Sequence, residues 1–234
     1  LVKIVNGLTA KSESPGPMTC AHLLGQPDHY TPETFRVFYW WPFTKYVEDT
    51  GFCTDEQRAA SAGNERVVLS FQKGKIVGRN QIQDYVHRPL AFENHSLYEF
   101  LCTTVVKKLT KKNLNNVRAS TKNCDDYSQH YSFQQDHPLH DSHGVFLIKN
   151  DRVLLNFVGG TLPRRDRGDH ETYCRVMLTM FAPQGWRSGI DLRPDARTWG
   201  ELFDATTFHA SHIQIMDNMN LLYECYDAKH DWAA

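Results

Sequence analysis

Apolar residues recur at helical spacing in several stretches of the chain. Ser96 and Glu99 match a capping box, and the helix that they begin is expected to extend to about Leu109. Its predicted apolar face consists of Leu97, Leu101, Val105, Val106 and Leu109. The same periodicity predicts a shorter helix over 18–24, which Gly25 and Pro27 end.

The C-terminal half carries further helical patterns. Asp169 is the predicted N-cap of a helix that Pro183 closes, and Thr198 with Glu201 forms a second capping box. The inner face of the Asp169 helix is predicted to consist of Tyr173, Val176, Met177, Met180 and Phe181. A last helix over about 210–228 is predicted to bury Ile215, Met219, Leu222 and Tyr226.

Strands are predicted where apolar and β-branched residues run together. The aromatic segment 35–43 is typical of a buried strand, and 48–64 is typical of a loop. One hairpin is expected from 66–71 and 75–79 around Lys73-Gly74. A second is expected from the following pair of segments, 144–149 and 152–158 around Asn150-Asp151.

Strand pairs mixed with helices, without regular βαβ alternation, predict an α+β fold. It would contain two β-hairpins, or small antiparallel sheets, packed with about five helices, and its C-terminal half would be mostly helical. We expect an N-terminal α+β subdomain over 1–118, a polar linker over 119–142, and a hairpin with helices over 143–234.

Composition places the chain among globular proteins. It has 234 residues, of which 41% are hydrophobic and 23% charged. No run approaches the roughly 18 apolar residues of a membrane helix, and no signal peptide is visible. The six cysteines are far apart in sequence, and those in helical surroundings, such as Cys102 and Cys174, are expected to be reduced core residues, which favours a nuclear or cytosolic protein. The Leu start leads us to expect a piece of a longer protein.

A formal net charge of −1 hides a basic middle third. Residues 64–122 carry 11 basic and 4 acidic side chains, which indicates a segment that faces a polyanion. The strongest candidates for phosphate contacts are four lysines, Lys107, Lys108, Lys111 and Lys112. The alternative is a solvated face whose lysines lie at a helix C-terminus and interact with its dipole.

Arg164, Arg165 and Arg167 are the second candidate group. They directly precede the Asp169 helix, and arginines beside a helix N-terminus suit phosphate binding. The alternative is local ion pairing with three nearby acids, Asp166, Asp169 and Glu171.

The motifs of several enzyme classes are absent. The sequence contains no Walker A loop, no GxGxxG and no HExxH. The cluster His137, His140 and His143 has spacing that suits a zinc or manganese site, or else surface and capping roles. Tyr223 and Tyr226 resemble a paired-tyrosine nucleophile, although their helical positions favour core packing.

Five blocks in order resemble the Rep–helicase polyprotein of Helitron rolling-circle transposons. The first three are SPGPMTCAHLLGQPDHYTPETFRVFYWWPF (14–43), QDYVHRPLAFENHSLYEF (83–100) and GGTLPRRDRGDHETYCRVMLTMFAPQGWRSGIDL (159–192). TWGELF and LLYECYDAKHDW resemble the closing blocks before the helicase. One departure is Gln184-Gly185, inserted where the family usually runs Pro-Trp directly.

This resemblance implies a connector between a Rep nuclease and an ATP-dependent helicase, with no catalytic residue and no cofactor of its own. ATP and Mg²⁺ would belong to the helicase domain alone. The expected partners are single-stranded DNA and the two flanking domains, and Trp40 or Trp41, if exposed, would stack on bases. The alternatives are a structural scaffold with an apolar surface patch and a metal-dependent enzyme at His137, His140 and His143.

Overall fold

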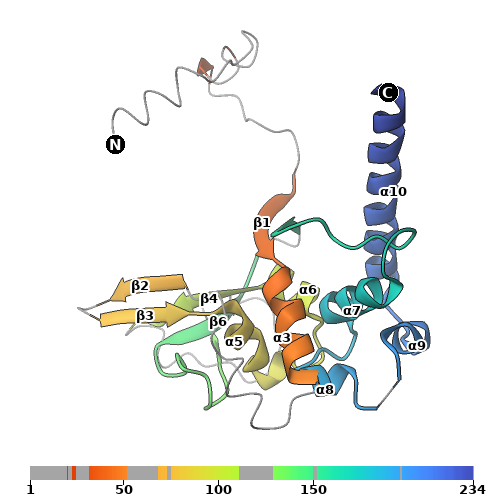
Figure 1. Cartoon of the computed structure of the whole chain (residues 1–234). Helices are drawn as coiled ribbons and strands as arrows, with labels where there is room; N and C mark the ends of the chain where they lie inside the picture. Colours follow the sequence, from red (N-terminus) through yellow and green to blue (C-terminus); the bar gives the residue numbers. More distant parts are fainter. Residues whose placement is uncertain are drawn as a thin grey trace. The chain divides into compact units, whose positions relative to one another are not determined.

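The computed structural model describes residues 20, 23–24, 32–51, 68–72, 75–110, 129–149, 152–195 and 197–233 (Figure 1). The chain divides into two compact units, Leu1–Thr34 and Phe35–Ala234. β1 begins at Thr34, the last residue of the first unit, and the remaining elements belong to the second unit. In chain order the described elements are β1 (Thr34–Tyr39), α3 (Trp41–Gly51), β2 (Val68–Gln72), β3 (Lys75–Arg79), α5 (Gln81–Val86), η1 (Leu90–Phe92), α6 (Leu97–Thr103), β4 (Thr104–Lys108), β5 (Tyr131–Ser132), β6 (His143–Leu147), β7 (Val153–Val158), α7 (His170–Phe181), α8 (Gly189–Leu192), α9 (Trp199–Ala205) and α10 (Ala210–Ala233).

The fold is α+β, as predicted. Small sheets are formed by the parallel pair β1–β7, the antiparallel pair β2–β3 and the antiparallel order β4-β6-β5. Every regular element described after β7 is a helix, from α7 to α10. No helix among the described residues is long and apolar enough to span a membrane. The helix predicted over 18–24 falls mostly outside the described residues.

One predicted hairpin is confirmed and the other is wrong. β2 and β3 pair with Gln72 opposite Lys75, and the Lys73-Gly74 turn lies outside the described residues. The two strands of the second prediction exist but do not pair, because β6 lies between β4 and β5 while β7 pairs with β1. Four of the five residues of β6 are buried, which suits a central strand with a partner on each edge.

The aromatic segment 35–43 was predicted as one strand, but it contains a strand and the start of a helix. β1 ends at Tyr39, and α3 begins at Trp41 with Pro42 in its first turn, where proline is tolerated. The helix extends to Gly51, into the segment predicted as a loop; 52–64 lies outside the described residues.

The capping box of α6 is confirmed, but the predicted length of this helix is wrong. Ser96 and Glu99 make both bonds of the box, and the helix ends at Thr103. The next residues are β-branched and favour a strand, so they form β4 and pair with β6. The C-terminal helix dipole therefore does not explain Lys107 and Lys108, which lie in this strand.

Part of the predicted polar linker 119–142 is ordered around the core. β5 pairs with β6, and Tyr131 and Phe133 are buried within the main hydrophobic cluster. This cluster also contains residues from both predicted subdomains, and the second compact unit spans 35–234 without a division.

α7 lies at the centre of the core. All five residues of its predicted inner face are buried, and Asp169 caps it through the amides of Glu171 and Thr172. α3 and α8 pack so closely that a Cβ on Gly189 would lie 2.0 Å from the Val47 carbonyl oxygen. This position therefore has room for glycine only.

α10 is longer than predicted and buries a different set of residues. His212 and Met216 are buried in its first half, whereas the predicted core residues Leu222 and Tyr226 are each 51% exposed. Ile215 and Met219 are half-buried. The second half of the helix extends beyond α7 and α9 (Figure 1), so few neighbours cover it.

Candidate nucleic-acid interface

Lys107 and Lys108 are exposed at the end of β4, opposite Gly144 and His143 of β6. The Lys107 ammonium lies 5.8 Å from the centre of the Phe146 ring, which is within the range of a cation–π interaction. The other two predicted lysines, Lys111 and Lys112, lie outside the described residues. The described part of the lysine group is thus the end of a strand.

A cavity of about 470 Å³ lies between β1, the start of α3, the start of α5 and β4. Its lining combines aromatic and aliphatic side chains with two amides and one guanidinium: Arg36, Val37, Tyr39, Pro42, Phe43, Asn80, Gln81, Ile82, Val105 and Val106. Val105 and Val106 directly precede the two lysines in β4. The cavity wall therefore continues into a positively charged strand end.

Arg36 lines the β1 side of this cavity, and two tryptophans, Trp40 and Trp41, follow the lining residue Tyr39 in sequence. The Arg36 guanidinium donates to the Leu101 carbonyl and, at 2.7 Å, to that of Thr104, which ties β1 to the junction of α6 and β4. Trp40 is 6% exposed, as expected of a core residue, whereas Trp41 is 49% exposed. Trp41 is therefore the tryptophan that a ligand can reach.

Arg164 makes ion pairs rather than presenting a free cation. It donates two hydrogen bonds to Asp166, at 2.9 and 2.6 Å, and two to Asp227 of α10, at 3.0 and 2.7 Å. These bonds raise the pKa of Arg164 and hold the pKa values of both carboxyls below their usual range.

Arg165 and Arg167 also pair with α10. Arg165 lies 3.0 Å from Asp217 and Arg167 lies 3.4 Å from Asp227. Local ion pairing was one of the two interpretations of this arginine group, and the Asp166 pair agrees with it. The partners on α10 are more than 50 residues away in sequence, so no local pattern could indicate them.

The other two acids predicted to pair with these arginines instead cap helices. Asp169 caps α7. The Glu171 carboxylate accepts hydrogen bonds from the amides of Trp199, at 2.7 Å, and Gly200, at 2.9 Å, and so caps the N-terminus of α9. The capping box of Thr198 and Glu201 is confirmed at the same helix end.

The three candidate metal-binding histidines have separate partners. His137 is buried, accepts a hydrogen bond from the Leu139 amide at Nδ1, and therefore donates from Nε2 to Asp84 at 3.2 Å. His140 Nδ1 lies 2.7 Å from the Phe133 carbonyl, and His143 Nδ1 lies 2.9 Å from the Ser142 hydroxyl. Within the described residues, no group of three His, Cys, Asp or Glu side chains could hold a metal ion.

The remaining chemical candidates have structural roles. Burial raises the pKa of the Cys102 and Cys174 thiols to about 11, so both stay protonated at neutral pH. The Tyr223 hydroxyl donates to the Leu162 carbonyl at 2.9 Å, whereas Tyr226 is exposed. The two tyrosines thus differ in environment.

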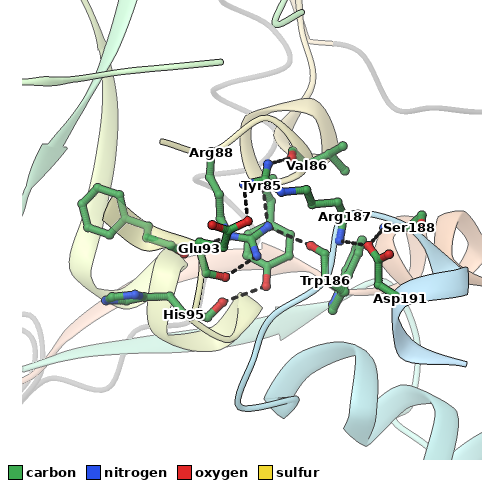
Figure 2. Close-up of polar contacts among 10 residues, drawn as sticks. Tyr85, Val86, Arg88, Glu93, His95, Trp186, Arg187, Ser188 and Asp191 are labelled. Carbon is green, nitrogen blue, oxygen red and sulfur yellow. Dashed lines mark hydrogen bonds and ion pairs between the residues drawn. The ribbon is translucent and has the colours of Figure 1, made fainter. Parts of the chain in front are cut away.

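Arg88 is a buried, highly connected polar residue that the sequence patterns did not single out. It is 1% exposed and donates to four backbone carbonyls, those of Tyr85, Phe92, Glu93 and Trp186 (Figure 2). In the sequence, the only indication that Arg88 matters is its position in the block 83–100, one of the five blocks that carry the family resemblance. Because Trp186 belongs to 159–192, Arg88 joins two of the five blocks.

Neighbouring residues complete this network. Burial raises the pKa of Tyr85 to about 12, so its hydroxyl stays protonated and donates to the His95 carbonyl at 2.9 Å. Arg187 donates to the Val86 carbonyl at 2.6 Å, and Asp191 accepts from the amides of Arg187 and Ser188 (Figure 2). These residues hold the segment after α7 against α5.

Comparison with known proteins identifies no relative of this chain: no family model, curated protein or solved structure matches it.

Proposed function

We propose that this chain is a non-catalytic connector of a Helitron-type Rep–helicase polyprotein, and that it guides single-stranded DNA between the nuclease and helicase domains. The observation that carries the proposal is the cavity beside β1, whose β4 wall leads directly into Lys107 and Lys108. ATP and Mg²⁺ would serve the helicase domain, and the protein would work in the nucleus or cytosol.

The cavity and the strand end together have the features of a single-strand binding groove. Such grooves combine cations that follow the phosphates with aromatic side chains on which bases stack. Lys107 and Lys108 are exposed, and β4 rises only about 3.3 Å per residue, so the backbones of both residues lie close to the cavity wall, while their side chains leave opposite faces of the strand. Trp41 lies in sequence between two lining residues, Tyr39 and Pro42, and offers an exposed ring.

The test is fluorescence anisotropy of a labelled oligo-dT with the whole chain at two salt concentrations. We expect binding at low salt that falls steeply as salt rises. Lys107→Ala/Lys108→Ala should weaken binding about tenfold and reduce the salt slope by about 1.4, or ~0.7 per lost phosphate contact. Arg193→Ala/Arg197→Ala removes the same charge from the segment between α8 and α9 and should have a much smaller effect. Absence of single-strand binding even at low salt would contradict the proposal.

The base-stacking part of the proposal has its own variant. Trp41→Ala should weaken oligo-dT binding by about 1–3 kcal/mol, the usual contribution of one stacked base. Ile190→Ala is the matched control, because it also removes a half-exposed large apolar side chain but from α8. Equal losses in both variants would show that Trp41 has no specific role in stacking.

A structural scaffold that orients the Rep and helicase domains is the second candidate. The observation that favours it is a set of exposed apolar side chains on the second half of α10, Leu221, Leu222 and Tyr226, which are 51–56% exposed. A purely structural role predicts that charge reversal at Lys107 and Lys108 leaves the activity of the whole polyprotein intact. The guiding role predicts a loss, so one assay of coupled nicking and unwinding separates the two.

A further inference from the structure

Two aspartates of α10 form ion pairs with all three arginines of the segment that precedes α7. Asp227 binds Arg164 and Arg167, and Asp217 binds Arg165. The two aspartates are ten residues apart, which corresponds to about 15 Å along a helix. They therefore present two separate negative charges to one basic segment.

Phosphates can replace these carboxylates. A guanidinium binds a phosphate through the same paired N–H···O geometry that Arg164 makes with Asp227. The outer pairs are exposed, with the side chains of Arg165, Asp217 and Arg167 at 46%, 48% and 68% exposure, and exposed pairs are weak and screened by salt. Exchange of one anion for another thus costs little at these positions.

Arg164 keeps its position without α10 carboxylates. It is held by Asp166 from its own segment, through two hydrogen bonds that do not depend on α10. Its side chain is only 16% exposed. One arginine of the group is therefore oriented before any ligand arrives.

The second half of α10 is held against this segment by a small number of contacts. The first half is anchored by the buried side chains of His212 and Met216. Beyond Met219, α10 contacts the 162–167 segment through Tyr223, which reaches the Leu162 carbonyl and Arg164, and through Asp227. Release would break these contacts and expose the Tyr223 ring, which packs against the core.

We propose that Arg164, Arg165 and Arg167 form a second phosphate-binding site for single-stranded DNA, which Asp217 and Asp227 cover until DNA displaces them. This inference rests on the proposed function. DNA at the site and the docked second half of α10 exclude one another, so binding of the strand frees this half-helix. The two equilibria are linked, and each weakens the other by the same factor.

The test compares oligo-dT affinity in variants of the whole chain. Asp217→Asn/Asp227→Asn should bind about tenfold more tightly and with a steeper salt dependence, because it frees cations for phosphates. Asp141→Asn/Asp195→Asn, the matched control, changes the net charge equally at exposed sites away from the arginines. A gain no larger than that of the control would overturn the inference.

Two further measurements keep this result separate from the proposed function. The gain should disappear when Arg164, Arg165 and Arg167 are replaced by Gln, and a gain that persists would overturn the inference. Oligo-dT should also speed amide exchange over 219–229 in the unmodified chain, and unchanged exchange at saturation would contradict release of α10. The Lys107→Ala/Lys108→Ala result tests the groove alone, so the groove can fail while this site stands.

Discussion

The guanidinium of Arg88 donates a 2.7 Å hydrogen bond to the backbone carbonyl of Trp186, which is 98 residues away in sequence. Its other bonds are also to backbone carbonyls, and its ring contact is with Tyr85 at 4.3 Å. Burial lowers the pKa of Arg88, but four carbonyl acceptors stabilise the cation. One buried side chain thus connects the end of α5 to the segment after α7.

Replacement of this side chain should destabilise the whole second unit. Arg88→Met should lower the free energy of unfolding by about 3–5 kcal/mol, because it removes the side-chain donor from four carbonyls, and those of Tyr85 and Phe92 keep only a backbone amide. Urea unfolding followed by tryptophan fluorescence measures the loss. Arg197→Met removes an arginine from an exposed pair with Asp195 and should change stability by less than ~1 kcal/mol. Similar losses in both variants would refute the role of Arg88.

Gly185 should be the most restricted residue of the turn before Trp186. It has a φ of 63°, and a Cβ there would lie 2.5 Å from Arg88 Nη2 and 2.6 Å from the His95 carbonyl oxygen. Gly185→Ala should cost about 2–4 kcal/mol, from backbone strain and from displacement of Arg88. Gly160 also has a positive φ, 123°, but open space around it, so Gly160→Ala reports backbone strain alone, and a larger loss in Gly185→Ala would come from the steric contact.

Glu171 should stabilise α9 from a distance of 28 residues in sequence. Glu171→Gln removes the negative charge and one of two acceptors at the N-terminus of α9, and should cost about 1–2 kcal/mol. Amide exchange over 199–205 should become faster than in the rest of the core. Glu201→Gln keeps an acceptor for the Thr198 amide and should cost less stability than Glu171→Gln. A greater loss of stability in Glu201→Gln would contradict the stronger role of Glu171.

Docking of α10 should weaken in acid. Burial lowers the pKa of His212, and Glu99 at 3.5 Å opposes this effect while His209 adds to it. The folded state therefore binds the proton less readily than the unfolded chain, so stability present above pH ~6.5 is lost as the pH falls below it. His87 and His95 have lowered pKa values as well and add to the same loss.

The contribution of His212 can be separated by substitution. His212→Gln should reduce the loss of stability between pH 7.5 and 5.5, measured as the shift of the urea midpoint. His170→Gln, which replaces an exposed histidine of α7, is the matched control. An unchanged pH dependence in His212→Gln would show that His212 does not contribute to the loss of stability in acid.

Local chemistry was sufficient to predict the helix starts. Ser96, Asp169 and Thr198 cap helices as predicted, because an N-cap bonds to amides within three residues and the interaction is written in adjacent sequence. The buried face of α7 was predictable for a related reason, since its period of 3.6 needs no knowledge of the partner.

Strand partners and the fate of the charged groups depended on the tertiary structure. The apolar sequence of β6 could pair with several other strands. In the folded chain it is buried between β4 and β5 and pairs with these two. The cavity beside β1 exists only because β1, α3, α5 and β4 meet there.

The sequence by itself determined the α+β class, the caps, the inner face of α7 and the presence of a basic segment before Asp169. Only the tertiary structure decided that Lys107 and Lys108 end a strand, that Asp217 and Asp227 pair with the arginines, and that Arg88 is a buried hub. Caps and amphipathic periods act over a few residues. A charge finds its partner through space, so the fold determines which acids reach which arginines.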